Sequence, residues 1–182
     1  MTKAIGKVWN VISTILVAVI VVLAVLLAGV RVFGYTPYVV LSGSMEPTYH
    51  VGSLVYVEKV DYRAIQVGDP ITFVLDENLT VATHRVIAIS EDGEYFTTQG
   101  DANDAPDGAP VWYKNLVGRP VFTIPYLGYF SNWITNPPGR YVAGPAAAIF
   151  LILLFLPNLL AKAEEADRRD AERKQRKNDT PE

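Results

Sequence analysis

Apolar residues gather in two blocks without charge, one towards each end of the chain. The blocks cover residues 11–30 and 141–161, and each has about the 20 residues with which an α-helix crosses roughly 30 Å of hydrocarbon. We therefore expect two transmembrane helices. A cleavable signal peptide is the alternative for the first block, but its apolar core, residues 15–30, exceeds the roughly 7–15 residues usual in such a segment, which favours a retained anchor.

Between the blocks, β-branched and aromatic residues alternate with polar ones in short runs that end at turn residues. This pattern predicts a mainly β domain over residues 35–138, without a helix of clear period. Residues 76–78 separate two of the runs as a hairpin turn, and Asp92-Gly93 marks a second turn at residues 91–94. Aromatic residues within 125–133 suit a membrane interface. The expected strands cover residues 54–60, 71–75, 79–89, 95–99 and 116–124.

Basic residues lie outside the two apolar blocks. Lys3 and Lys7 precede the first block, and seven Lys or Arg residues follow the second. Because cytoplasmic flanks carry the excess of Lys and Arg, we expect residues 1–10 to be a cytoplasmic N-terminus and residues 162–182 a charged cytoplasmic tail. The segment 35–138 is then extracytoplasmic.

Composition narrows the function classes. The chain is 50% hydrophobic, with a mean hydropathy of +0.19. Its segment 35–138 has twelve Asp and Glu against five Lys and Arg, which does not suit nucleic acid. There is no cysteine, which excludes a disulfide framework, a thiol nucleophile and a Cys-ligated metal.

A Ser-Gly-Ser triplet, residues 42–44, follows soon after the first apolar block. Alone, such a triplet is most often a turn. Gly43 permits an unusual backbone path, however, and Pro47 biases the residue before it towards an extended conformation. Ser44 could thus be held as a nucleophile, with its own N–H and the Ser42 hydroxyl able to bind a developing oxyanion.

A serine hydroxyl needs a base within hydrogen-bond reach. The residues leave four candidates open: His84, His50, Lys59 and Lys114. His84 is favoured because its place in the middle of an expected strand gives the side chain a fixed direction. The absence of catalysis also stays open at this point.

The loop at residues 100–108 contributes three carboxylates. It opens like a calcium-binding EF-hand but fails at later positions, where Ala105, Pro106 and Trp112 replace the ligand, glycine and glutamate of that motif. Two interpretations remain, a polar surface loop and a loop in which one Asp orients the base. Spacing alone does not choose between them.

Three segments in this order resemble a known family. They read SGSMEPT at 42–48, THRV at 83–86 and QGDANDAPDG at 99–108, and IPYLGYF follows at 124–130. Together, behind an N-terminal apolar block, they are similar to type I signal peptidases of the archaeal and endoplasmic-reticulum branch. The resemblance covers about residues 35–131. It implies a signal-peptidase-like β-sheet catalytic domain, which we expect between the two transmembrane helices.

The family's site residues carry over onto these motifs. The resemblance implies that Ser44 is the nucleophile, that His84 is the general base, and that Asp107 stabilises the imidazolium. Asp101 matches a supporting residue, and Ser42 matches a residue of the oxyanion hole. Two further positions are not catalytic: His50 is a usual residue of this branch, and Gln99 stands where a lysine is more usual.

The expected function is that of a membrane-bound serine endopeptidase, which removes N-terminal signal peptides from exported preproteins at the outer face of the plasma membrane. Signal peptides and the bilayer are the implied partners, and association with the translocation machinery stays open. Neither a metal nor an organic cofactor is implied. A histidine base predicts activity that rises with pH through about 6–7. The alternative is a catalytically silent, membrane-tethered β module that acts as an assembly or scaffold subunit, and incubation with a preprotein distinguishes the two.

Overall fold

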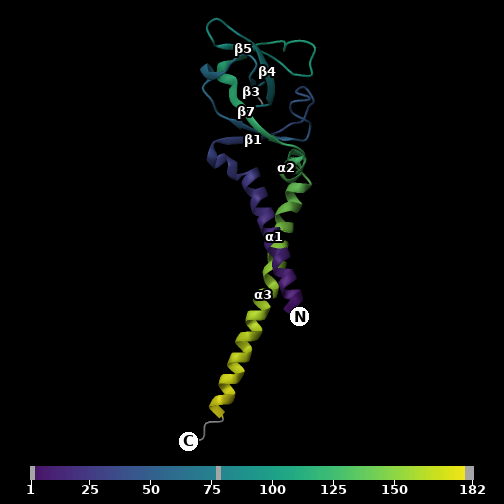
Figure 1. Ribbon diagram of the computed structural model, residues 1–182, viewed down its shortest axis with the longest axis vertical. Coiled ribbons are helices and arrows are strands. Elements are labelled where there is room, and N and C mark those ends of the chain that lie inside the picture. The colour runs from purple at the N-terminus through teal and green to yellow at the C-terminus, as the bar shows by residue number, and fades with distance from the viewer. Residues whose placement is uncertain (1–2, 77–78, 179–182) are drawn as a thin grey trace.

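A seven-stranded antiparallel sheet forms the centre of the structure, a computed structural model that describes residues 3–76 and 79–178. The strand order is β1-β2-β7-β3-β4-β5-β6, and the sheet curves into a half-barrel. Mainly β architecture is thus confirmed between the helices (Figure 1). The strands are β1 (Tyr35–Val39), β2 (Leu54–Glu58), β3 (Pro70–Val74), β4 (Val81–Ile89), β5 (Tyr95–Gln99), β6 (Val111–Trp112) and β7 (Leu116–Ile124).

All five expected strands are present, with small changes at their ends. β3 and β4 form the expected hairpin, in which Ile71 lies opposite His84. Part of its turn, residues 77–78, lies outside the described residues. The sequence did not predict β1 or the two-residue β6. In β1, Pro37 weakens the strand signal because proline cannot donate to a ladder, but β1 is an edge strand, where proline is tolerated.

Helix α2 (Leu127–Thr135) forms where no helix was expected. That expectation is wrong because nine residues give a weak periodic signal, and packing decides the conformation. Gly128 is buried against the loop before β2, where an added Cβ would lie 2.4 Å from the carbonyl oxygen of Ser53. The sheet therefore holds α2 at a distance that only glycine allows.

Two longer helices project from the same end of the sheet; the chain enters the sheet along one and leaves it along the other (Figure 1). They are α1 (Lys3–Leu27) and α3 (Gly139–Asn178). By length and composition, Val8–Leu27 could cross a membrane, and the apolar part of α3 passes the same test only jointly with α2, from which it is bent by 95°. Within the described residues, a second transmembrane helix at 141–161 is therefore not shown and stays a proposal.

The first apolar helix also ends before residue 30, where the expected span 11–30 ends. Helix α1 stops at Leu27, and the chain continues into a short 3-10 helix, η1 (Gly29–Phe33). Two further 3-10 turns follow along the chain: η2 (Tyr62–Ala64) lies between β2 and β3, and η3 (Tyr113–Asn115) lies between β6 and β7.

Tyr56 joins helix α1 to the sheet. Its side chain, on β2, is fully buried and stacks on Phe122 of β7 with ring centroids 4.3 Å apart. Its hydroxyl donates a hydrogen bond of 2.9 Å to the carbonyl oxygen of Leu26, in the last turn of α1. Val30 and Leu54 complete this small core. A second, larger core lies between β3, β4 and β5 and contains Ile65, Ile71, Phe73, Val86, Phe96 and Val111.

Candidate active site

A cavity of about 740 Å³ collects four of the five candidate residues. Ser42, Ser44, His84 and Asp107 all line it. They come from separate parts of the chain: the turns that follow β1, the middle of β4, and the loop after β5. Asp101 is not among the lining residues. Most other lining side chains are apolar, and Leu41, Phe73 and Leu79 are examples.

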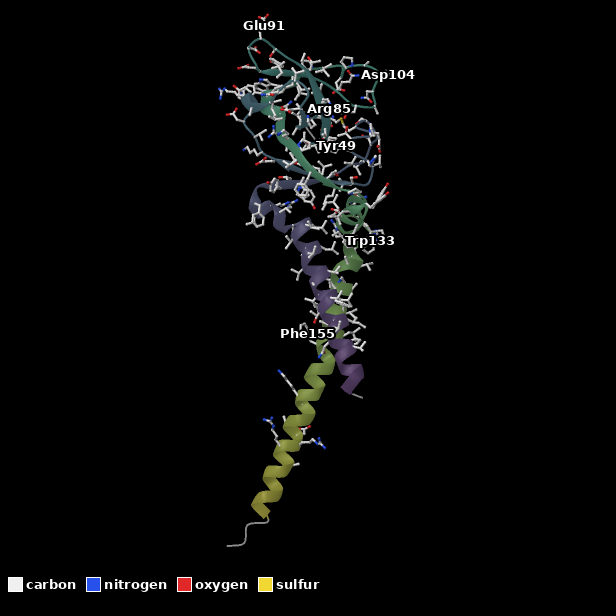
Figure 2. All side chains as sticks on the ribbon, in the orientation of Figure 1. Tyr49, Arg85, Glu91, Asp104, Trp133 and Phe155 are labelled. Atoms are coloured by element: carbon white, nitrogen blue, oxygen red, sulfur yellow. The ribbon has the colours of Figure 1, made fainter. Side chains whose placement is uncertain are left out.

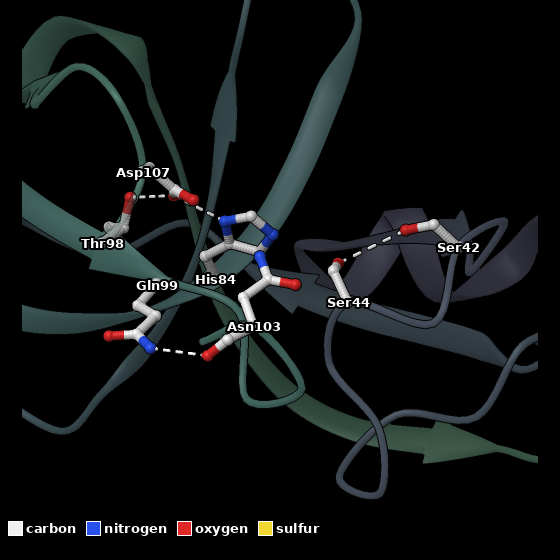
Figure 3. Close-up of polar contacts among 7 residues, drawn as sticks. All are labelled: Ser42, Ser44, His84, Thr98, Gln99, Asn103 and Asp107. Carbon is white, nitrogen blue, oxygen red and sulfur yellow. Dashed lines mark hydrogen bonds and ion pairs between the residues drawn. The ribbon is translucent and has the colours of Figure 1, made fainter. Parts of the chain in front are cut away.

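His84 lies against Asp107. Nδ1 of the imidazole is 2.5 Å from Oδ2 of the carboxylate, as Figure 3 shows, and both side chains are largely buried. Since an ionised carboxylate only accepts hydrogen bonds, Nδ1 carries the proton and Nε2 keeps its lone pair. Nε2 is therefore the ring atom that can take a proton from another group.

Thr98 fixes the carboxylate from the other side. Its hydroxyl donates to the same Oδ2 of Asp107 at 2.6 Å, and its backbone carbonyl accepts the Asp107 N–H at 2.8 Å. Thr98 is fully buried in β5. Two hydrogen bonds to one residue thus hold Asp107 in register with the strand that neighbours His84.

Ser44 lies in a series of turns rather than in an extended segment. Its hydroxyl oxygen is 3.3 Å from that of Ser42 (Figure 3). Among the described residues, no hydrogen bond joins Ser44 to His84. Contacts between nucleophile and base are often long without substrate and close in the complex, and rotation about one side-chain bond moves a serine hydroxyl between staggered positions.

The backbone of Ser44 is held by the same loop that carries Asp107. The Ser44 carbonyl accepts a hydrogen bond of 2.9 Å from the Ala102 N–H. This contact requires Gly100, because a Cβ there would lie 2.5 Å from the Ser44 oxygen. Gln99 stabilises the turn by donating from its amide to the Asn103 carbonyl at 2.7 Å. The loop therefore positions both the serine and the aspartate.

Asp101 connects three segments behind the cavity. Arg85 donates to its two carboxylate oxygens at 2.7 and 2.6 Å, and the Thr48 hydroxyl donates at 2.5 Å. The hydrogen bonds from Arg85 hold the pKa of Asp101 below its ordinary value despite burial. Arg85 also donates to the Gly68 carbonyl at 2.8 Å. Asp101 therefore fixes the serine-bearing turns to β4, beside His84.

The other candidate bases lie elsewhere. His50 is mostly exposed, and its Nδ1 is 2.5 Å from Oε2 of Glu46. The Lys114 ammonium sits over the Trp112 ring, 4.4 Å from its centroid, and Lys59 is exposed at the end of β2. Neither these lysines nor His50 line the cavity. His84 is the candidate base that shares the cavity with Ser44.

Two of the three carboxylates of the 100–108 loop bind side chains of the protein. Asp101 accepts from Arg85 and Thr48, and Asp107 contacts His84 and Thr98. Within the part of the chain that the structure describes, no group of three or more His, Asp or Glu side chains could hold a metal ion. Of the two interpretations left open for this loop, the geometry favours the one in which an aspartate orients a histidine.

Sequence reasoning missed Thr48, Arg85 and Thr98. Thr48 and Arg85 lie inside the quoted motifs, but pairing across 16 to 53 positions leaves no local signal. Thr98 carried a weak signal, since alternation along residues 95–99 places it on the same face as Phe96, which is also buried. A buried threonine hydroxyl requires a partner.

Comparison with known proteins gives a consistent result. The family model described as "Signal peptidase, peptidase S26" matches residues 9–120. The chain is 42% identical over 117 residues to Signal peptidase I W of Bacillus subtilis (strain 168), covering 59% of this chain and 61% of that protein. It is 35% identical over 110 residues to the signal peptidase complex catalytic subunit SEC11C of Homo sapiens, covering 55% of this chain and 57% of that protein.

The matched region thus spans less than two thirds of these curated relatives. The family model, in contrast, covers more than half of this chain, including η1, β1 to β6 and the cavity residues Ser42, Ser44, His84 and Asp107. The chain therefore belongs to the signal peptidase family, peptidase S26.

Proposed function

We propose that this chain is a membrane-bound serine endopeptidase that cleaves N-terminal signal peptides from exported preproteins. One observation carries the proposal: Ser42, Ser44, His84 and Asp107 line one cavity, with His84 and Asp107 in contact. Membership of the signal peptidase family supports the substrate class. None of these observations favours the alternative, a catalytically silent β module.

In the proposed first step, the Ser44 Oγ attacks the carbonyl carbon of the scissile peptide bond. Nε2 of His84 takes the hydroxyl proton as the C–O bond forms, and the Ser42 hydroxyl and the Ser44 N–H stabilise the oxyanion. Asp107 stabilises the imidazolium through Nδ1. His84 then gives the proton to the leaving amine nitrogen, the C–N bond breaks, and an acyl-enzyme remains.

In the second step, water attacks the ester carbon of the acyl-enzyme. His84 takes a proton from this water and returns it to Oγ of Ser44, which leaves as the ester bond breaks. The carboxylic acid of the signal peptide is released, and the serine is regenerated. All proton transfers use groups of this chain and water.

We also propose how the chain is oriented in the membrane. The β domain that contains the cavity lies on the outer face, both termini are cytoplasmic, and residues 141–161 form the second transmembrane span. Two features support this: the excess of Lys and Arg on the terminal side of each apolar block, and the projection of α1 and α3 from the same end of the sheet (Figure 1). Association with the translocation machinery belongs to the same proposal, supported by relatives named as subunits of a signal peptidase complex.

Replacement of Ser44 by alanine tests the proposal. We expect Ser44→Ala to lower kcat for a preprotein by about 10⁶-fold, the loss seen when a catalytic serine is removed. Ser42→Ala should cost about 10²–10³-fold, as for one oxyanion donor. The assay follows the new N-terminus of a preprotein in vesicles containing the full chain.

Ser90→Ala provides a control in the turn between β4 and β5, away from the cavity. It should cleave at the original rate. Cleavage by Ser44→Ala at that same rate would exclude Ser44 as the nucleophile, and with it the proposed reaction at this cavity.

A further inference from the structure

Asn103 belongs to the loop after β5, and its backbone is held from both sides. Its N–H donates to the Gly100 carbonyl at 3.0 Å, and its carbonyl accepts from the Gln99 amide at 2.7 Å. The side chain, in contrast, is exposed, and among the residues that the structure describes its amide has no hydrogen-bond partner. A fixed backbone thus carries an amide that is available to another molecule.

The side chain of Asn103 lies next to the turn that carries Ser44. A Cβ placed on Gly100 would lie 2.5 Å from the Ser44 carbonyl oxygen and 2.8 Å from Nδ2 of Asn103. Both atoms therefore adjoin the same small space, which is open only because residue 100 is glycine. The Asn103 amide is thereby held close to the proposed nucleophile.

Figure 3 shows the direction of this side chain. From its loop, Asn103 points towards the space between His84 and Ser44, on the side of the imidazole away from Asp107. Nε2 of His84 is on that side, because Nδ1 contacts Asp107. Asn103 is not among the residues that line the cavity. It therefore approaches the reacting groups from outside the cavity.

The proposed reaction defines which part of a substrate passes this position. In the first step, His84 gives its proton to the leaving amine nitrogen, so this nitrogen lies within about 3 Å of Nε2. The leaving nitrogen belongs to the first residue of the released mature protein. That residue therefore begins beside His84, in the space towards which Asn103 points.

An amide side chain suits a peptide backbone at this position. Asparagine offers two N–H donors and a carbonyl acceptor, and each residue of a substrate has a backbone carbonyl whatever its side chain. The amide is also uncharged. A second carboxylate beside His84 would favour the imidazolium before the reaction begins, whereas an amide leaves this effect to Asp107.

We propose that Nδ2 of Asn103 donates a hydrogen bond to the backbone carbonyl of the first residue after the scissile bond. This contact holds the leaving amine at Nε2 of His84 while the C–N bond breaks. Because it binds the backbone, the contact acts on any mature sequence. The inference rests on the proposed function and adds a substrate contact on the released side of the cut.

Two synthetic substrates test the contact. Both have the same residues before the cut, ending in Ala-Leu-Ala, a sequence with the small residues typical of signal-peptide cleavage sites. One continues with four residues. The other ends in p-nitroanilide, which keeps a scissile amide bond but has no carbonyl after it. The full chain in detergent is assayed with each, and the ratio of the two kcat/KM values is compared between variants.

We expect Asn103→Ala to lower this ratio, longer peptide over p-nitroanilide, by about 3- to 10-fold, which corresponds to the loss of one hydrogen bond. The ratio does not depend on the amount of folded protein. Asp104→Ala is the matched control, because Asp104 is the next residue of the loop and is also exposed (Figure 2). It should keep the original ratio.

Trapping of the acyl-enzyme by an added amine gives a second readout. The amine nitrogen attacks the ester carbon and forms a new C–N bond, while its proton passes through His84 to Oγ of Ser44 as the ester bond breaks. Alaninamide has a carbonyl where the first mature residue has one, and isopropylamine has the same skeleton without it. For Asn103→Ala, the ratio of amide to hydrolysed product should fall about 3- to 10-fold with alaninamide and stay the same with isopropylamine.

Three outcomes contradict these expectations. If Asn103→Ala keeps the original ratio of kcat/KM values, whether both values fall or neither does, the side chain does not bind the released residue. An equal fall in trapping with both amines also excludes the contact. If the original chain cleaves neither substrate, the proposed function is wrong and the contact with it, so this failure is distinguishable from the other two.

Discussion

At the scale of single residues, Asp101 connects segments that are far apart in the chain. It joins Arg85 on β4 to Thr48 in the turns that contain Ser44. Bidentate pairs between arginine and carboxylate are strong and directional, and Asp101 is mostly buried. Its carboxylate therefore holds the turns that carry Ser44 against β4, although it does not line the cavity.

This pairing predicts a pH-dependent stability. Because Arg85 lowers the pKa of Asp101 in the folded state, the unfolded chain binds this proton more readily. The contribution of Asp101 to stability is complete above its unfolded pKa, about 3.9, and is lost as pH falls through the lower folded pKa. We expect Asp101→Asn to cost about 1.5–3 kcal/mol at neutral pH, as for hydrogen bonds to charged groups.

Guanidinium unfolding of the full chain in detergent measures this difference. It should be large at neutral pH and smaller at about pH 3, below the unfolded pKa of about 3.9, because the unfolded chain then binds a proton that the folded carboxylate resists. Asp104→Asn is the control, because Asp104 is exposed in the same loop (Figure 2). A cost for Asp101→Asn that does not change between these pH values would contradict the ion pair as its source.

At the scale of elements, the loop after β5 decides the geometry of the site. Its residues between Gly100 and Asp107 contact the Ser44 carbonyl, Thr98 and His84. β4 and β5 pair with one register shift, between Val86 and Ala88, and polar and apolar residues alternate along them in the sequence. The loop has no such period, and its conformation comes from contacts with the turns at residues 42–49.

Gly100→Ala tests this contact. An added Cβ would lie 2.5 Å from the Ser44 carbonyl oxygen, a backbone atom that cannot move without the turn that carries Ser44. We expect a destabilisation of about 1–3 kcal/mol, as for overpacking. Cleavage of a preprotein should fall by up to about 10²-fold, because misplacement by roughly 1 Å is costly in an active site.

Gly108→Ala is the matched control for stability, because a Cβ there would meet no atom within 4 Å. Its Tm should equal that of the original chain. Preprotein cleavage by Gly100→Ala at an unchanged kcat would mean that the loop does not position Ser44.

The elements themselves divide by the strength of their local pattern. Five strands follow from alternating polar and apolar residues, and 95–99 and 116–124 match β5 and β7 at both ends. The helix α2 was missed because its outer residues are aromatic. Aromatic residues have lower helix propensity than alanine or leucine, and Phe130 and Trp133 are exposed, so burial gives no helical period here.

At the scale of the whole molecule, the joint between α1 and the sheet sets where the cavity lies relative to the apolar helices. Tyr56 makes this joint with one hydrogen bond to Leu26 and one ring stack on Phe122. Burial raises the pKa of Tyr56 above its ordinary value, so its hydroxyl remains a donor at neutral pH.

We expect Tyr56→Phe to destabilise the folded chain by about 0.5–1.5 kcal/mol, the usual net contribution of a hydrogen bond. The ring stack on Phe122 remains in this variant, so the loss reports the bond to Leu26. Guanidinium unfolding of the full chain measures it. Tyr95→Phe, on a half-exposed ring of β5, should change stability little, and an equal loss for both variants would contradict the special role of Tyr56.

The sequence by itself determined what depends on neighbouring residues. Uncharged runs of about 20 residues identified two apolar segments, alternation identified most strands, and the motifs around Ser44, His84 and Asp107 identified the family. These features can be recognised without the tertiary structure, because residues close together in the chain lie on the same face of a strand or within the same apolar segment.

Only the tertiary structure decided which polar groups meet. Sequence left four candidate bases, and the fold puts His84 in one cavity with Ser44, while His50 pairs with Glu46. It also assigned Asp101 to Arg85 and Thr48, and turned the aromatic side of α2 outwards. The physical reason is common to all three: hydrogen bonds and packing act over a few ångströms in space, and chain distance does not encode which segments come that close.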